Sequence, residues 1–255
     1  MAAETDQSYE KIQALIKEKP ELSSTVSAKL ASLLEELELS KDSTGKNYGF
    51  DKLHHGFRKF RKGFYEQNPE LFGKLKTGQW PKFMVIACAD SRVDPSVVLG
   101  LRPGDAFIVR NIANMVPPFE KEGYPSMGAS LEYAVLHLKV DHILIIGHRA
   151  CGGVKALVTM TPEDGKYSTT FIERWVEIGK PARKEVTAQM PQAETPEVCT
   201  TCEKETVKTS LNNLLTYPFV VDAVKDKKVS LHGGYYDLVE GKFETWDFDL
   251  PAPKV

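Results

Sequence analysis

The sequence predicts an α/β protein with a central, mostly parallel β-sheet flanked by helices and preceded by an N-terminal helical arm. Three runs of consecutive apolar residues, 83–87, 106–109 and 142–146, have the length of buried strands. Helical periodicity fills the segment 126–139 between the second and third runs. Apolar strands that alternate with helices are typical of a parallel sheet covered on both faces.

The composition is that of an ordinary globular protein with no charged partner. Of 255 residues, 42% are hydrophobic and 27% are charged, and 33 basic residues against 35 acidic ones give a net charge of −2. This balance gives no reason to expect nucleic acid or an anionic membrane as a partner. No apolar run approaches the roughly 20 residues of a membrane span. The early acidic residues argue against a secretory signal or an organelle transit peptide.

The first residues are expected to form a helical arm. Segment 8–39 carries two apolar stripes at helical spacing, interrupted by Pro20. Such helices cannot bury their apolar faces alone, so the arm is expected to pack on the main body or on a neighbouring subunit. The polar stretch 40–47 is expected to be a linker. We therefore predict an arm over 1–45 and a single α/β domain over 46–255.

A second helical region is predicted over 51–75 and contains the basic run 58–62. Basic residues interleaved with aromatics can bind nucleic acid. In a chain that is acidic overall, however, a solvated helix face is the favoured interpretation of this run.

The second half of the chain continues the α/β pattern. Residues 159–197 are polar and punctuated by prolines, with one amphipathic helix expected near 171–178. A further helix is expected over 202–215. The segments 229–234 and 243–246 are expected to be two late strands.

Metal-binding residue types follow two of the predicted strands. Cys88 comes directly after the run 83–87, and His148 and Cys151 follow the run 142–146. The carboxyl ends of parallel strands lie at one edge of a sheet, where ligands bind. Thiolate and imidazole are ligands that Zn²⁺ prefers, and three protein ligands leave a fourth, catalytic position open. Small buried cysteines at strand ends are also common, so the spacing alone leaves that alternative open.

Asp90 and Arg92 stand two and four residues beyond Cys88. The carboxylate of Asp90 could accept a hydrogen bond from a metal-bound water, or could itself occupy the open position on the metal. Arg92 could hold that carboxylate through a bidentate pair. An ordinary salt bridge in a turn is the alternative.

Several motifs resemble those of plant-type β-carbonic anhydrases. Cys88-Ala89-Asp90-Ser91-Arg92 and Gly147-His148-x-x-Cys151-Gly152-Gly153 are similar to the two signature motifs of that family. Three further segments resemble its plant branch, and the likeness covers nearly the whole chain: Asn111–Asn114, Leu131–Val135 and Asn213–Pro218.

The resemblance implies a role for each matching residue. It implies that Cys88, His148 and Cys151 are zinc ligands and that Asp90 and Arg92 form a catalytic dyad. It also implies a substrate pocket, whose matching residues are Phe171, Tyr217, Gly152 and Lys121. The family forms homodimers or higher even oligomers, and a plant member would be cytoplasmic or, as a mature chain, stromal in the chloroplast.

Two positions depart from the plant pattern. Arg149 stands where the plant motif usually has a serine beside the ligand histidine, which would place a charge near the metal. Lys121 stands where the family has a glutamine that hydrogen-bonds in the pocket. These two residues are what favours a non-catalytic, small-molecule-binding or scaffolding relative as an alternative.

The resemblance implies reversible hydration of CO2 to bicarbonate and a proton, by attack of zinc-bound hydroxide on CO2. Zinc lowers the pKa of bound water from about 15.7 to roughly 7. Because two thiolates cancel the charge of the ion, Asp90 is expected to assist by accepting a hydrogen bond that favours hydroxide. Hydrolysis of CS2 or COS at the same site stays an alternative.

Cys199 and Cys202 form a separate C-x-x-C pair. Such a pair can be redox-active or can supply half of a zinc site. The chain contains no partner pair, so a structural role is the favoured interpretation.

Overall fold

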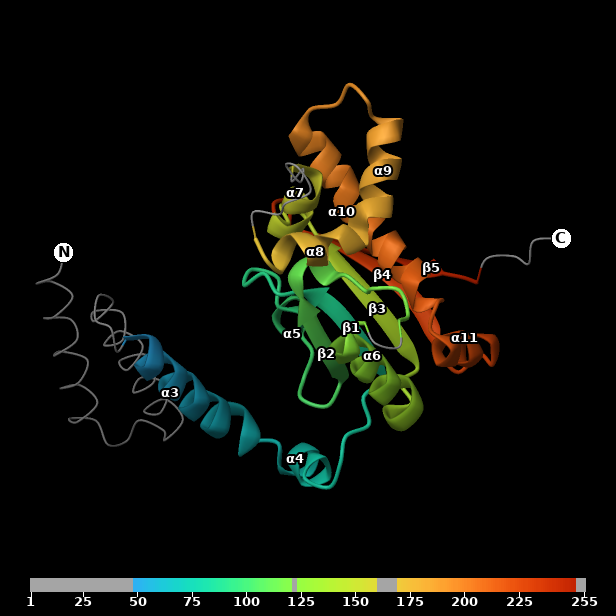
Figure 1. Ribbon diagram of the computed structural model, residues 1–255. Coiled ribbons are helices and arrows are strands. Elements are labelled where there is room, and N and C mark those ends of the chain that lie inside the picture. The colour runs from blue at the N-terminus through green and yellow to red at the C-terminus, as the bar shows by residue number, and fades with distance from the viewer. Residues whose placement is uncertain (1–47, 121–122, 160–168, 251–255) are drawn as a thin grey trace, which may run out of the picture. The chain divides into compact units, whose positions relative to one another are not determined.

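The computed structural model describes residues 48–120, 123–159 and 169–250 (Figure 1). The predicted arm over 1–45 lies outside the described residues, and its existence as a separate domain stays a prediction. By its internal contacts the chain divides into two compact units, Met1–Gly78 and Gln79–Val255.

The first unit contains α3 (Tyr48–Phe60), a π-helical turn η1 (Arg61–Tyr65) and α4 (Pro69–Leu75). The helical region predicted over 51–75 is therefore confirmed, with one break. The chain leaves helical geometry at Asn68 (φ −128°, ψ 59°), and Pro69 starts the next helix. Proline suits a first helical turn because its missing N–H would have no partner there.

Aromatic side chains hold these helices together. The rings of Phe60, Phe64 and Tyr65 surround the buried ring of Phe72, with centroids 4.4 to 5.9 Å apart. Edge-to-face and tilted arrangements of this kind are the favoured geometries of aromatic pairs.

The second unit is built on a five-stranded sheet with the order β2-β1-β3-β4-β5 (Figure 1). Its strands are β1 (Phe83–Cys88), β2 (Ala106–Asn111), β3 (His142–His148), β4 (Ser230–Asp237) and β5 (Lys242–Phe248). All neighbouring pairs are parallel except β4 and β5, which are antiparallel. The predicted, mostly parallel sheet is therefore confirmed, and the carboxyl ends of β1 and β3 lie side by side.

Helices and helical turns connect the strands. They are α5 (Pro95–Val98), η2 (Ile112–Asn114), α6 (Pro125–Glu132), η3 (Tyr133–Leu138), α7 (Gly152–Thr159), α8 (Ile172–Val176), η4 (Glu177–Gly179), α9 (Lys180–Gln189), α10 (Thr195–Leu214) and α11 (Pro218–Lys225).

Three of these helices correct the sequence interpretation. The sequence pattern predicts neither α9 nor α11, and it predicts a start of α10 at Cys202 instead of Thr195. Each of the three helices has a proline in its first turn, namely Pro181, Pro196 and Pro218. Pro181 and Pro196 lie in the polar, proline-punctuated stretch 159–197, yet all three prolines mark helix starts.

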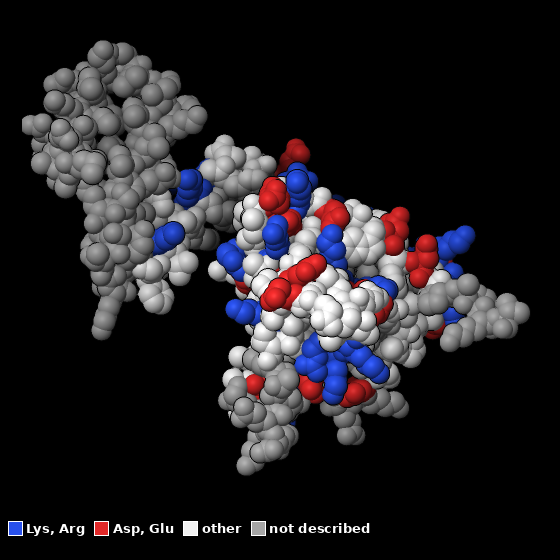
Figure 2. Space-filling model, turned by 90° about the horizontal axis from the view of Figure 1, so that it is seen from above, with Lys and Arg blue, Asp and Glu red and all other residues white. Residues whose placement is uncertain are grey.

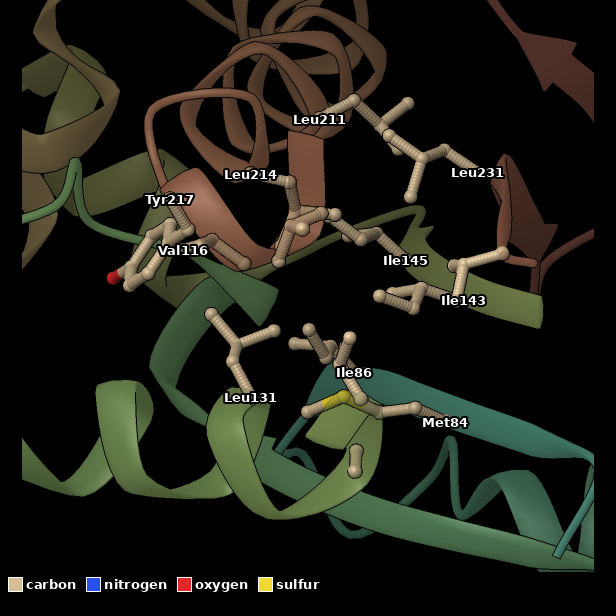
Figure 3. Close-up of a cluster of buried hydrophobic side chains, with 14 of the residues drawn as sticks. Met84, Ile86, Val116, Leu131, Ile143, Ile145, Leu211, Leu214, Tyr217 and Leu231 are labelled. Carbon is tan, nitrogen blue, oxygen red and sulfur yellow. The ribbon is translucent and has the colours of Figure 1, made fainter. Parts of the chain in front are cut away.

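One face of the sheet carries the main hydrophobic core (Figure 3). Met84 and Ile86 of β1 and Ile143 and Ile145 of β3 are fully buried there. Side chains of α6, α10 and α11 cover them, among them Leu131, Leu211, Leu214 and Val220. The alternate residues of each strand point to the other face, as the pleat of a strand requires.

The opposite face has a thinner cover. Val85, Ala87 and Ile146 are buried there, packed against partly buried neighbours such as Leu99 and Leu101. Within the described part of this unit, the short α5 and the loop after it lie over this face (Figure 1). Helices therefore lie over both faces, as expected, but one face has much less helical cover than the other.

Charges are mixed on the surface. Figure 2 shows acidic and basic side chains interspersed over one face, in keeping with the net charge of −2. No helix among the described residues has the length and apolar character needed to cross a membrane.

Candidate metal centre

Three metal-ligating side chains meet at the carboxyl edge of the sheet. Cys88 ends β1, His148 ends β3, and Cys151 directly precedes α7. Their ligand atoms all lie within 4.8 Å of one another, and all three residues are buried. The two sulfur atoms are 4.0 Å apart. The three residues that the sequence analysis chose as ligands are therefore brought together.

The cluster fits a tetrahedral zinc ion. Sulfur ligands bound at about 2.3 Å in a tetrahedron lie roughly 3.8 Å apart, close to the separation found here. His148 Nδ1 hydrogen-bonds to the carbonyl oxygen of Arg149 at 2.9 Å. The other ring nitrogen, Nε2, is buried and has no hydrogen-bond partner. An unpartnered buried nitrogen is costly unless it ligates a metal, and a bond from Nδ1 to a carbonyl is typical of metal-binding histidines.

The ionisation of the two thiols is coupled. A hydrogen bond with Cys151 lowers the pKa of Cys88 to about 4, against the opposing effect of burial. The same hydrogen bond, burial and the charge of Cys88 all raise the pKa of Cys151. One thiolate can therefore form in the bare site, whereas a second needs a compensating cation. A divalent metal ion supplies that charge, and metal binding then releases the proton.

Asp90 and Arg92 form the bidentate pair that the sequence suggested. Arg92 Nε donates to Asp90 Oδ1 at 2.9 Å, and Nη2 donates to Oδ2 at 2.7 Å. The backbone N–H of Arg92 also donates to Oδ1, at 3.0 Å. These hydrogen bonds lower the pKa of Asp90, with the side-chain bond from Arg92 as the largest cause. Asp90 is therefore held as a carboxylate in one orientation.

The Asp90–Arg92 pair is tied to the turn that carries His148 and Cys151. Arg92 Nη2 donates to the carbonyl oxygen of Ala150 at 3.1 Å. Ala150 lies between His148 and Cys151 with a φ of 57°, in the left-handed region that non-glycine residues rarely adopt. Strained backbone of this kind is frequent at functional sites.

Arg110 braces the loop after β1, a role that the sequence analysis missed. Its guanidinium donates to the carbonyl oxygens of Cys88, at 3.0 Å, and Asp90, at 2.6 Å. A third bond, of 2.6 Å, reaches the carboxylate of Asp94. Arg110 sits on β2, opposite Ala87 of β1. The apolar run 106–109 predicted β2. Nothing in the sequence indicates that the next residue, Arg110, holds the loop after β1.

Glu203 supports the other ligand segment and was also missed. This residue of α10 is only 3% exposed. Its Oε1 accepts a hydrogen bond from the backbone N–H of Cys151 at 3.0 Å, and its Oε2 accepts one from the Tyr235 hydroxyl at 2.7 Å. Burial raises the pKa of Glu203. The only sequence signal is an acidic residue next to Cys202, in a helix that packs on the sheet.

Gly147 permits this close packing. A Cβ atom at Gly147 would lie 2.7 Å from Val207 Cγ2 and 3.1 Å from the carbonyl oxygen of Glu203. Helix α10 therefore lies directly against the backbone of β3, one residue before the ligand His148.

Arg149 is paired instead of facing the cluster as a free charge. Its Nη1 donates to Asp237 Oδ2 at 2.9 Å, and its backbone N–H donates to the carbonyl oxygen of Tyr236 at 3.0 Å. Asp237 ends β4. The charge that departs from the plant pattern is therefore balanced by a neighbouring carboxylate.

Of the predicted pocket residues that the structure describes, Gly152 adjoins the cluster, whereas Phe171 and Tyr217 belong to other surroundings. Gly152 begins α7, directly after Cys151. Phe171 is 82% exposed, whereas Tyr217 is buried with its hydroxyl donating to the carbonyl oxygen of Pro117 at 3.1 Å. Tyr217 belongs to the main core, and Cys88 and Cys151 belong to a second buried cluster. Lys121 lies outside the described residues.

The C-x-x-C pair lies on α10. Cys202 is fully buried, and burial raises its pKa to about 12. Burial also raises the pKa of Cys199. Thiols with raised pKa values are poor nucleophiles and poor redox centres at neutral pH. The structural interpretation of this pair is therefore supported.

Comparison with known proteins agrees with this site. A family model described as carbonic anhydrase matches residues 83–243. A curated relative, Beta carbonic anhydrase 3 of Arabidopsis thaliana, is 42% identical over 248 residues, which is 96% of this chain and 95% of the relative.

Solved structures show the same fold. The β-carbonic anhydrase CcaA has a TM-score of 0.72 at 28% identity, covering 80% of this chain and 93% of that one. The β-carbonic anhydrase CafA of Aspergillus fumigatus has a TM-score of 0.70 at 30% identity, with the same coverage. One of two tetrameric β-carbonic anhydrases from Sordaria macrospora has a TM-score of 0.69 at 29% identity, covering 77% and 96%.

The parallel sheet and the Cys-His-Cys cluster at its carboxyl edge define an α/β zinc enzyme. The chain belongs to the carbonic anhydrase family, in its β class. Its reaction is the reversible hydration of CO2 to bicarbonate, with zinc as cofactor.

Proposed function

We propose that Cys88, His148 and Cys151 hold the zinc ion of this carbonic anhydrase and that Asp90 and Arg92 form the catalytic dyad beside it. One observation carries the assignment of the ligands. Two buried thiols and an imidazole converge within 4.8 Å, and the imidazole presents a nitrogen with no other partner.

Zinc bound by these residues supplies a nucleophilic hydroxide from water near neutral pH. Asp90 acts on that nucleophile as a hydrogen-bond acceptor. Its Oδ1 already accepts two hydrogen bonds, from the side chain and the backbone N–H of Arg92, whereas its Oδ2 accepts one and keeps a further lone pair. An ionised carboxylate in a fixed orientation favours the deprotonated form of the nucleophile. The lone pairs of the nucleophile are then directed at CO2.

Arg92 keeps Asp90 in this role. A bidentate guanidinium fixes both oxygens, so the carboxylate cannot rotate toward the cluster and become a ligand itself. The bond from Arg92 to Ala150 links the orientation of the dyad to the turn between two of the ligands. The proposed metal ligands and the proposed acid–base group, Asp90, are therefore held in one connected network.

Phe171, Tyr217, Gly152 and Lys121 are proposed to shape the substrate pocket of the assembled enzyme. Phe171 is a large apolar side chain that is 82% exposed in the single chain, and exposed aromatics of this kind are frequent at interfaces. We infer that Phe171 and Tyr217 contribute to a pocket only when a second subunit is present.

We further propose a homodimer or a higher even oligomer. The two edge strands support this, because β2 is only half-buried and β5 is largely exposed along its length. Open strand edges and their side chains are ready surfaces for subunit contact. The Sordaria macrospora relatives are described as tetrameric. The arm over 1–45 is proposed to pack on the neighbouring subunit, and the compartment is proposed to be the cytoplasm or the chloroplast stroma.

The assignment is tested by stopped-flow CO2 hydration with zinc counted on the same sample. We expect about one tightly held zinc per chain and fast hydration. Cys151→Ser should lose both, whereas the matched control Cys199→Ser should keep both, because Cys199 lies outside the cluster. Full zinc content and activity in Cys151→Ser would overturn the ligand assignment. Zinc without hydration in the unmodified chain would indicate a binding protein.

A further inference from the structure

A second cluster of metal-binding side chains lies at the opposite end of β3 from the metal centre. His142 begins β3, and Ser230 begins β4, with His232 two residues further along. His142 pairs with Ser230 in the sheet register, and His232 pairs with Asp247 of β5. Their side chains therefore share one face of the sheet, the one with the thinner cover.

Three donor atoms converge in this cluster. His142 Nδ1 lies 2.7 Å from Ser230 Oγ and 3.1 Å from His232 Nε2. His232 Nε2 lies 2.9 Å from the same hydroxyl oxygen. In a six-coordinate shell, neighbouring ligands bound at about 2.0–2.2 Å lie roughly 3 Å apart, so these three atoms have the spacing of one face of such a shell.

Neighbouring side chains orient the imidazoles of His142 and His232 for metal binding. Asp247 Oδ1 lies 2.8 Å from His232 Nδ1, so the proton of that ring belongs on Nδ1 and the lone pair on Nε2. A carboxylate on the far nitrogen is the usual support of a metal-binding histidine. The ring of His142 stacks on Phe83, with centroids 5.1 Å apart and planes 20° apart, and this contact fixes its orientation.

The cluster opens into a cavity of about 940 Å³ that has room for water ligands. His142, Ser230 and His232 all line this cavity. The charged side chains around it balance, because three lysines (Lys225, Lys227, Lys228) face three aspartates (Asp141, Asp247, Asp249). No excess of positive charge therefore repels a cation.

We propose that His142, His232 and Ser230 form a second divalent-metal site, separate from the catalytic centre and selective for a borderline ion such as Zn²⁺. Imidazole nitrogen is a ligand that suits zinc better than magnesium or calcium. Because only two strong ligands are present and the rest of the shell is water, this ion exchanges readily, whereas the catalytic ion is retained. Binding links β3 to β4 directly and to β5 through Asp247.

The same atoms also resemble a nucleophile triad, because Ser230, His232 and Asp247 are linked in that order. Two features favour the metal site. First, a second imidazole, that of His142, is hydrogen-bonded to the hydroxyl of Ser230. Second, Asp247 is 83% exposed, whereas the aspartate of such a triad is buried.

Equilibrium dialysis of the zinc-loaded enzyme against micromolar Zn²⁺ tests this site. We expect one further zinc per chain, with affinity lowered at least about tenfold by His142→Gln or His232→Gln, and about tenfold by Asp247→Asn. His137→Gln should leave the affinity unchanged, because His137 lies on η3, outside the cluster. CO2 hydration should stay unchanged in all these variants, which shows that they fold.

Cys151→Ser separates this site from the catalytic one. That variant should lose the catalytic zinc and still take up the exchangeable ion, so a failure of either assignment is seen by itself. The absence of further zinc at free Zn²⁺ concentrations up to about 100 µM would overturn the proposal. Uptake that is unaffected by both histidine variants would overturn it as well, and so would labelling of Ser230 by an organophosphonate.

Discussion

The two ends of β3 carry two different kinds of histidine site. His148, at the carboxyl end, is buried beside two thiols and presents a nitrogen without a partner. His142, at the amino end, is half-buried and has both a hydroxyl and a second imidazole within hydrogen-bond distance. The first arrangement is costly without a metal ion, whereas the second is satisfied without one. Burial and the lack of a hydrogen-bond partner, more than the residue type, therefore distinguish the proposed permanent metal centre from the proposed exchangeable one.

The largest expected effect comes from substituting, in two matched variants, the histidine at each end of β3. His148→Gln should reduce CO2 hydration by at least about 10³-fold and release the zinc, because a ligand is lost. His142→Gln should leave hydration within about twofold of the unmodified enzyme. Stopped-flow rates and zinc content measure both, and equal losses in the two variants would erase the distinction between the sites.

The next effect concerns the two aspartates that stand beside the two sites. Asp90→Asn should retain zinc but lower kcat by about 10²-fold or more, the usual contribution of a positioned acid–base group. The lowered pKa of Asp90 means that the carboxylate of the unmodified enzyme is ionised throughout the neutral range, so protonation of Asp90 should not shape its pH–rate profile there. Asp247→Asn is the control and should not change kcat. Full activity in Asp90→Asn would remove Asp90 from the dyad.

Glu203 should affect metal retention more than chemistry. Glu203→Gln keeps the size of the side chain but weakens its hold on the Cys151 backbone N–H and on Tyr235. Loss of a supporting group of this kind typically costs 10- to 100-fold in metal affinity, so we expect about tenfold. Competition with a chelator measures it. An unchanged zinc affinity would assign Glu203 to packing alone.

Gly147 tests the close approach of α10 to β3. Gly147→Ala should lower the free energy of unfolding by about 1–3 kcal/mol, because its Cβ would overlap Val207 and the Glu203 carbonyl. Gly128→Ala is the control, since a Cβ there meets nothing within 4 Å. Urea unfolding of the two variants gives the comparison, and equal stability would mean that α10 can shift freely.

Arg149 should give the smallest effect. Because its charge is paired with Asp237 in a partly exposed ion pair, Arg149→Ser should change CO2 hydration by less than about threefold. A change above tenfold would show that this guanidinium acts on the site despite its partner.

The sequence was sufficient to predict the sheet and the convergence of Cys88, His148 and Cys151, because both depend on local patterns. Continuous apolar runs predicted β1, β2 and β3, and Cys88 and His148 are the polar residues that end β1 and β3. The helices α9 and α11 were missed although each has a proline in its first turn, because a proline can end a helix as well as start one. Local periodicity does not separate these two uses of proline.

The supporting residues could not be predicted for a different reason. Arg110 and Glu203 act on Cys88 and Cys151 from β2 and α10, at sequence distances of 22 and 52 residues. No periodicity connects such positions, and only the tertiary packing brings them together. The same holds for His142 and His232, which are 90 residues apart and meet because β3 and β4 are neighbours.

The most direct test of the central claim is X-ray absorption at the zinc edge of the enzyme, dialysed until one zinc per chain remains. We expect two sulfur ligands at about 2.3 Å and one imidazole nitrogen at about 2.0–2.1 Å, with a light atom in the remaining position. Cys151→Ser, if it retains any zinc, should show a single sulfur. A zinc shell of nitrogen and oxygen alone in the unmodified enzyme would contradict the assignment of Cys88, His148 and Cys151.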